Sequence, residues 1–252
     1  MWKKAVTGDL RVWGILRRRV WVLIFVLVAS AAVLAYETFA SDRDFFMPEP
    51  LGGVKVVIDP GHGGPDGGAS SGEVVESSIN LAIAKNLEKE LKSKGATVIM
   101  TRTKEGDALA ERQPGEDFPS IRARKMADLK LREEIALDEK PDMFLSVHVN
   151  AVPEEKWRGA QVFYHAEGHP DSERLAKAVQ ASFTETIETD REALAVRQVY
   201  LLKKVPTPAV LIETGFISNP EEKALLTDAG YQKKVAAAIA EGVSEFMYED
   251  MQ

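Results

Sequence analysis

Four histidine and glutamate side chains stand where a buried strand would end or a helix would begin. They are His62, Glu76, His148 and Glu213. Two imidazoles and one carboxylate are the protein ligands of an open catalytic zinc site. A further carboxylate beside such a site can carry protons for the attacking water. The residue types therefore predict a zinc hydrolase.

His62 lies in the glycine-rich string DPGHGG of residues 59–64, directly after a short apolar strand. Glycine lets the backbone turn sharply and lets a ligand approach, and ligands of open α/β sheets collect at the carboxyl ends of strands. A phosphate-binding loop is a rival interpretation. It fails because the Gly63–Gly68 spacing is followed by Ala69, where such a loop needs lysine. An ordinary loop histidine is the other alternative.

The other three residues each have a structural alternative to a chemical role. Glu76 begins an apolar-periodic helix, where the helix dipole favours any acid. His148 ends an apolar strand, where a buried histidine satisfied by its neighbours is common. Glu213 ends the most apolar strand of the chain. It is either the acid of a buried salt bridge with Arg102 or Arg132, or a carboxylate of raised pKa that works as base and then acid.

Composition and charge restrict both the site and its partners. The chain has no cysteine, so a zinc site must use histidine and carboxylate. Its 252 residues suffice for one sizeable α/β domain and a little more. Residues 1–36 carry a net charge of +5, so the remainder carries −12 of the total of −7. An acidic body repels polyanions, and nucleic acid is therefore discounted as a partner.

The N-terminal region predicts membrane targeting. Residues 1–19 form a basic segment that ends in three arginines, and residues 20–36 are apolar except for Ser30. This pattern places the basic segment in the cytosol and the rest of the chain outside it. The apolar segment is a retained signal-anchor or a cleaved signal peptide, with residues 38–40 as a fair cleavage site. Residues 37–53 are predicted as a linker, and 54–252 as the catalytic domain.

Strand and helix patterns alternate from Val54 onward, which indicates an α/β layer fold in a single domain. The predicted strands are 54–59, 96–101, 142–149, 160–164, 198–202 and 208–213. The predicted helices are 76–94, 120–139, 171–188, 219–228 and 230–248. The acidic segment 104–119 is expected to be a long loop, and either it or Arg102 is a candidate for positioning a substrate.

Four ordered strings resemble the zinc-dependent N-acetylmuramoyl-L-alanine amidases: VVIDPGHGG at 56–64, ESSINL at 76–81, SVHVNA at 146–151 and VLIETGFISN at 210–219. The resemblance covers about residues 54–248. It implies a mixed six-stranded sheet with helices on both faces. It also implies that His62, Glu76 and His148 bind Zn²⁺ and that Glu213 is the catalytic residue.

Two further strings, KWRGAQVFY at 156–164 and VYLLK at 199–203, resemble the germination-specific, sporulation-type members of this family. That resemblance implies hydrolysis of the amide between N-acetylmuramic acid and L-alanine in spore cortex peptidoglycan, as a step towards muramic-δ-lactam. It also implies an extracytoplasmic protein, membrane-anchored or secreted, in the space around the forespore. The sequence leaves open whether an activating partner protein is required.

Two other functions fit the same sequence. One is a wall-binding protein that kept the fold without catalysis, against which the two histidines and Glu213 argue. The other is a zinc peptidase that cuts a bond within the stem peptide. Stem-peptide preference and oligomeric state are also left open.

Overall fold

The structure, a computed structural model, describes the backbone of residues 7–45 and 49–250 and the side chains of residues 17–36 and 49–248. The chain divides into two units, Met1–Pro48 and Glu49–Gln252. Each unit is described below by itself.

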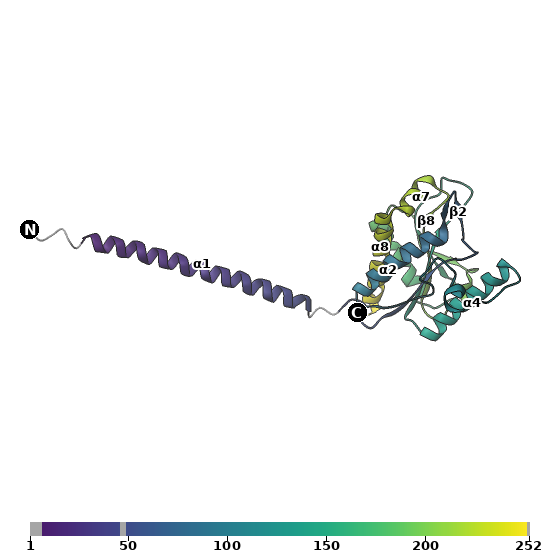
Figure 1. The fold of residues 1–252 in the computed structure, drawn as a ribbon, viewed down its shortest axis with the longest axis horizontal. Coiled ribbons are helices and arrows are strands. Elements are labelled where there is room, and N and C mark those ends of the chain that lie inside the picture. The colour runs from purple at the N-terminus through teal and green to yellow at the C-terminus, as the bar shows by residue number, and fades with distance from the viewer. Residues whose placement is uncertain (1–6, 46–48, 251–252) are drawn as a thin grey trace, which may run out of the picture. The chain divides into compact units, whose positions relative to one another are not determined.

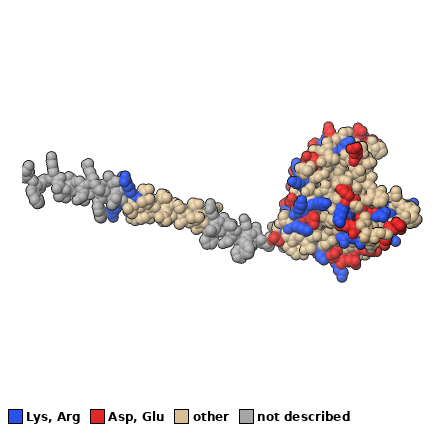
Figure 2. Space-filling view, viewed as in Figure 1, with Lys and Arg blue, Asp and Glu red and all other residues tan. Residues whose placement is uncertain are grey.

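The first unit is built on one helix, α1 (Thr7–Phe45). Its segment Arg17–Tyr36 has a mean hydropathy of 2.2 and is exposed along its length. Figure 2 shows this segment without charged side chains except for basic ones at one end. Among the described residues it is the one helix long and apolar enough to cross a membrane. Helix α1 continues into the segment expected as linker, because residues 37–45 contain no glycine or proline to end it.

The second unit contains a mixed six-stranded sheet in the order β4-β1-β5-β8-β6-β7. The neighbours among β4, β1, β5 and β8 pair in parallel, β6 runs antiparallel to β8, and β7 is parallel to β6. The strands are β1 (Lys55–Pro60), β4 (Thr97–Met100), β5 (Met143–Asn150), β6 (Gln161–His165), β7 (Leu194–Val196) and β8 (Ala209–Phe216). A separate small hairpin joins β2 (Ser70–Ser71) and β3 (Val74–Val75).

Helices cover both faces of the sheet, which confirms the predicted fold class (Figure 1). Successive strand residues point to opposite faces. Val56 and Ile58 therefore belong to the larger apolar cluster, whereas Val57 belongs to a smaller one on the other face. The larger cluster packs under α2 (Glu76–Ser93), α5 (Ser172–Thr186), α7 (Pro220–Thr227) and α8 (Ala229–Asp250). The smaller cluster packs under α4 (Ile121–Glu139) and α6 (Tyr200–Lys204).

Two of the predicted elements are wrong. The segment expected as a strand at 198–202 consists of two loop residues and the first three residues of α6, and the strand of this region is β7, at Leu194–Val196. Leu201 and Leu202 are both buried against the sheet. A short apolar run of this kind fits a buried strand or a buried helix equally well. The loop expected at 104–119 contains a short helix, α3 (Ala108–Arg112), whose first turn is capped by the Asp107 side chain.

Candidate metal centre and active site

The candidate site lies at the carboxyl ends of three neighbouring strands. β1, β5 and β8 are parallel, so their carboxyl ends meet at one edge of the sheet. His148 and Glu213 are directly paired across β5 and β8. His62 follows the last residue of β1 by two positions, and Glu76 is the first residue of α2. The topology thus brings together all four residues that the sequence singled out.

The side chains of His62, Glu76 and His148 converge on one point. Glu76 Oε1 lies 3.3 Å from His62 Nε2 and 3.0 Å from His148 Nδ1. One nitrogen of each histidine and one oxygen of Glu76 all lie within 4.8 Å of one another. Two ligands at 2.0–2.1 Å from a tetrahedral zinc ion are separated by roughly 3.3 Å. The group therefore has the donor types and spacing to hold a metal ion.

Glu76 is buried and kept ionised by its neighbours. Burial by itself would raise its pKa, but the hydrogen bonds and charges of His148 and His62 hold the pKa below its usual value. Its second oxygen, Oε2, accepts a hydrogen bond from the Ala69 backbone at 2.8 Å. Glu76 therefore does more than begin a helix, because its carboxylate points into the histidine pair.

Two buried arginines hold the loop that carries His62. Arg132 donates to the carbonyl oxygens of Pro60 (2.8 Å) and His62 (2.7 Å). Arg102 donates to those of Pro60 (2.9 Å) and Gly61 (3.0 Å). His62 has a φ of 61°, which is uncommon for a residue other than glycine. The two guanidinium groups stabilise that turn and so aim the His62 side chain.

This arrangement corrects two expectations. Arg102 is fully buried and bonded to backbone carbonyls, so it shapes the His62 loop instead of positioning a substrate. Arg132 pairs with Asp59 and Asp128, each at 2.7 Å, and neither arginine pairs with Glu213. The sequence signal that was missed is Asp59 in the DPGHGG string, whose carboxylate also accepts hydrogen bonds from two buried hydroxyls.

Gly61 is required by the close approach of His148. A Cβ atom added at Gly61 would fall on the imidazole ring of His148. Gly68 is under the same constraint, because a Cβ there would meet Glu76 and His62. The glycines of this loop therefore leave room for the two histidines and the carboxylate to converge.

Glu213 lies beside this group with one oxygen unused. Its Oε2 is buried and has no hydrogen-bond partner among the described residues. Burial, reinforced by the charge of Glu76, raises the pKa of Glu213 to about 7, against the opposing effect of His148 and His62. A carboxyl group with this pKa can both accept and return a proton near neutral pH.

A cavity of about 360 Å³ opens onto these groups. His62, His148 and Glu213 line it together with Lys125 of α4 and Tyr200 of α6. The cavity gives solvent and a ligand access to these groups. It is therefore the candidate active site.

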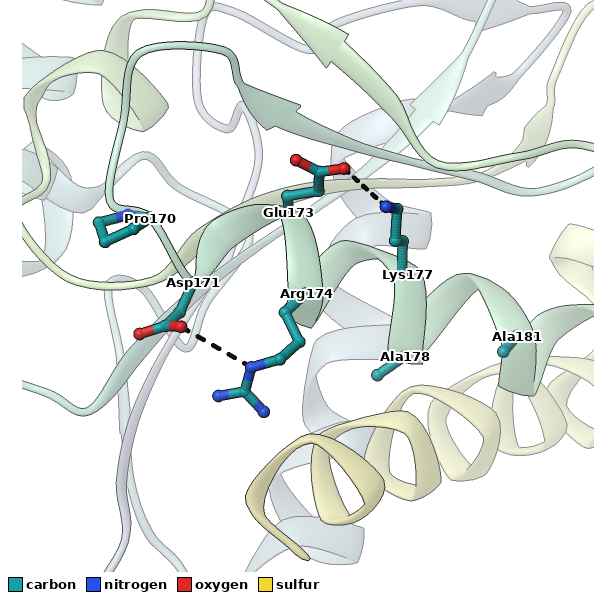
Figure 3. A pocket seen from close by; sticks show the side chains of 7 residues that line it. All are labelled: Pro170, Asp171, Glu173, Arg174, Lys177, Ala178 and Ala181. Atoms are coloured by element: carbon teal, nitrogen blue, oxygen red, sulfur yellow. Dashed lines mark ion pairs between the residues drawn. The ribbon is translucent and has the colours of Figure 1, made fainter. Parts of the chain in front are cut away.

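A second hollow, of about 580 Å³, lies at the start of α5 and contains none of the predicted site residues (Figure 3). Its charged side chains already form ion pairs with each other. Lys177 contacts Glu173 at 2.6 Å, and Arg174 contacts Asp171 at 3.7 Å. Neither a free acid or base nor a metal-binding group faces this hollow among the described residues, so it is not assigned chemistry.

The fold and the site define a hydrolase domain of the α/β class with a group that can hold a metal ion. Residues 56–245 match the N-acetylmuramoyl-L-alanine amidase family, and the chain belongs to this family.

Two relatives illustrate the similarity. The germination-specific N-acetylmuramoyl-L-alanine amidase of Bacillus subtilis is 35% identical over 93% of this chain and 98% of its own length. The CwlD amidase of Clostridioides difficile, solved in complex with the GerS lipoprotein, superposes with a TM-score of 0.73. It is 36% identical, and the match covers 78% of this chain and all of that one. The predicted resemblance is thereby confirmed.

We expect Arg132→Met to lower the free energy of unfolding by about 3–5 kcal/mol, because Asp59 and Asp128 would be left buried without their cation. Arg158→Met is the matched control, since the ion pairs of Arg158 are exposed and contribute at most about 1 kcal/mol. Urea unfolding measures both. Equal losses in the two variants would contradict the stabilising role given to Arg132.

The pH dependence of stability reports on Glu213. In metal-free protein its pKa is about 7 when folded, against an ordinary value of 4.5, so the folded state holds more protons between these values. The free energy of unfolding therefore falls as pH rises through this window, by roughly 1.4 kcal/mol per pKa unit. We expect Glu213→Gln to remove this fall and to be more stable than wild type above the window.

The control for this measurement is Glu73→Gln, because Glu73 is exposed. Urea unfolding between about pH 4 and pH 8 in the presence of a chelator supplies the data. Parallel curves for wild type and Glu213→Gln would show that Glu213 titrates normally.

Proposed function

We propose that this chain is a zinc-dependent hydrolase that cleaves the amide between N-acetylmuramic acid and L-alanine in peptidoglycan. One observation carries the proposal: His62, Glu76 and His148 converge beside a cavity onto which Glu213 also opens, and Glu213 Oε2 is buried without a partner among the described residues. Membership of the amidase family supports the choice of bond.

The donor set favours zinc. Two imidazole nitrogens and one carboxylate oxygen, with an open side facing a cavity, are typical of catalytic zinc. His62, Glu76 and His148 would hold the ion, and Asp66 and Val149 bond to His62 and Glu76 from outside the group. When bound, zinc supplies a Lewis acid that polarises the scissile carbonyl and makes water acidic enough to attack it.

Glu213 is the proposed catalytic residue. Its Oε2 accepts a proton from the attacking water, and the same oxygen then returns a proton to the amine nitrogen of the departing L-alanine. Burial raises the pKa of Glu213 above its ordinary value, which makes the group a better proton acceptor and still able to return the proton.

We further propose that the substrate is spore cortex peptidoglycan and that the reaction is a step towards muramic-δ-lactam. The support is similarity to the germination-specific amidase of Bacillus subtilis over nearly the whole of both chains. The strings at 156–164 and 199–203 point to the same subtype.

The proposed place of action is outside the cytoplasm, in the space around the forespore. The apolar segment of α1 supports a membrane anchor or a signal peptide. The CwlD amidase of Clostridioides difficile was solved with a lipoprotein partner. A partner of that kind would activate this chain or help to load its metal, and assays should therefore be run with and without one.

We expect Glu213→Gln to retain zinc and to lose hydrolysis by about 10²–10⁴-fold, because the proton acceptor is gone while the three proposed ligands stay. His148→Ala should lose zinc as well as activity. Both variants are compared with the full chain in detergent, using metal analysis and mass spectrometry of digested cortex peptidoglycan.

The products distinguish the alternatives. Amidase action leaves muramic acid without stem peptide, whereas a peptidase leaves glycan that still carries a peptide stub. A folded chain that holds no zinc and releases nothing, with or without a lipoprotein partner, would favour a wall-binding protein. Near-normal turnover by Glu213→Gln would remove Glu213 from the mechanism.

A further inference from the structure

A second carboxylate contacts His62 on the side away from Glu76. Asp66 Oδ2 lies 3.1 Å from His62 Nδ1, and Lys125 Nζ lies 2.8 Å from the same oxygen. Asp66 is four residues beyond His62 and is held near it by a backbone bridge to Gly63. A chain of contacts therefore runs from α4 through Lys125 and Asp66 to the His62 ring.

The contact between Asp66 and Nδ1 affects which nitrogen of the His62 ring has a lone pair that can bind a metal ion. A neutral imidazole carries its proton on one nitrogen and presents a lone pair on the other. Both ring nitrogens of His62 face a carboxylate, Asp66 at Nδ1 and Glu76 at Nε2. When Nδ1 donates to Asp66, the lone pair falls on Nε2 and is free to bind a metal ion. Nε2 is the atom that faces Glu76 at 3.3 Å. Carboxylates that bond to the far nitrogen of a ligand histidine fix its tautomer and its orientation in this way.

The two histidines are held differently. The His148 ring packs against Gly61 and is paired with Glu76 through Nδ1. No hydrogen bond from its Nε2 is found among the described residues. Arg132 holds the backbone of His62 through its carbonyl oxygen, while the ring contacts Glu76 through Nε2 and Asp66 through Nδ1. The orientation of the His62 ring thus depends on Asp66 in a way that His148 does not share.

Lys125 gives Asp66 its own fixed position. The Lys125 side chain is 45% exposed and the Asp66 side chain 27% exposed, and both line the cavity that contains Glu213. An exposed ion pair of this kind adds little to global stability. The ion pair would instead act locally, by fixing the orientation of the Asp66 carboxylate towards His62.

We propose that Asp66, held by Lys125, is a positioning residue that sets His62 with Nε2 directed at the metal-binding group. The inference rests on the proposed function insofar as that function requires a metal ion. It adds a residue that acts through His62 and touches neither the reacting amide nor the ion.

The first test is zinc affinity, measured by chelator competition on the full chain in detergent. Asp66→Ala should weaken binding by about 10–100-fold, the usual cost of removing such a partner. Asp66→Asn should lose less, since it keeps an oxygen that can accept from Nδ1. Glu73→Ala is the matched control, because it removes one exposed acid from the same part of the chain and should leave affinity unchanged.

Lys125→Met tests whether Lys125 acts on His62 through Asp66. It should weaken zinc binding in the wild-type background and have no effect in Asp66→Ala, because the two residues would act through one contact. Independent, additive losses would mean that Lys125 acts through general charge. Excess zinc should restore the turnover of Asp66→Ala to within a few fold of wild type, whereas a misfolded variant would not recover.

The second test reads the ring itself. Nitrogen NMR of metal-free protein at about pH 9, where histidine is neutral, should show more of the Nδ1–H tautomer of His62 in wild type than in Asp66→Ala. In Asp66→Ala the Nε2–H tautomer, which can donate to Glu76, should gain. Unchanged tautomers together with unchanged zinc affinity would overturn the proposal. A wild-type chain that binds no zinc would instead count against the proposed function, and the tautomer measurement would still decide the role of Asp66.

Discussion

The arrangement of this site depends on one buried ion pair, between Arg132 and Asp59. Arg132 lies under the turn that follows β1 and bonds to its backbone carbonyls as well as to Asp59 at 2.7 Å. A buried charge is costly unless it is paired and fully hydrogen-bonded. Here Asp59 also accepts from two hydroxyls, so the pair is satisfied. The turn at His62, with its positive φ, persists because the buried Arg132–Asp59 pair holds the backbone there.

The surroundings shift the pKa values of the two carboxylates of this site in opposite directions. Glu76 sits between two imidazoles and accepts backbone hydrogen bonds, which keep it ionised. Glu213 has a buried oxygen without a partner, and burial raises its pKa to about 7. Groups whose pKa values are pushed apart in this manner take different chemical roles. One suits a ligand, and the other suits a carrier of protons.

The order and direction of the strands bring these groups together. Three parallel strands end at one edge and α2 begins beside them, so residues from four distant segments meet at one site. Helices on both faces exclude water from the sheet and leave this edge open. The apolar helix α1 belongs to a separate unit.

The sequence by itself determined the α/β class, most element boundaries and the four residues of the candidate site. It could do so because strand and helix periodicity is local, and because each of these residues stands at a recognisable strand end or helix start. It could not determine the roles of Arg102 and Arg132, the helix at Tyr200–Lys204, or the contact between Asp66 and Lys125. These depend on partners far apart in the chain, such as Asp59 and Arg132. Only the packing of the folded chain brings such residues within hydrogen-bond distance.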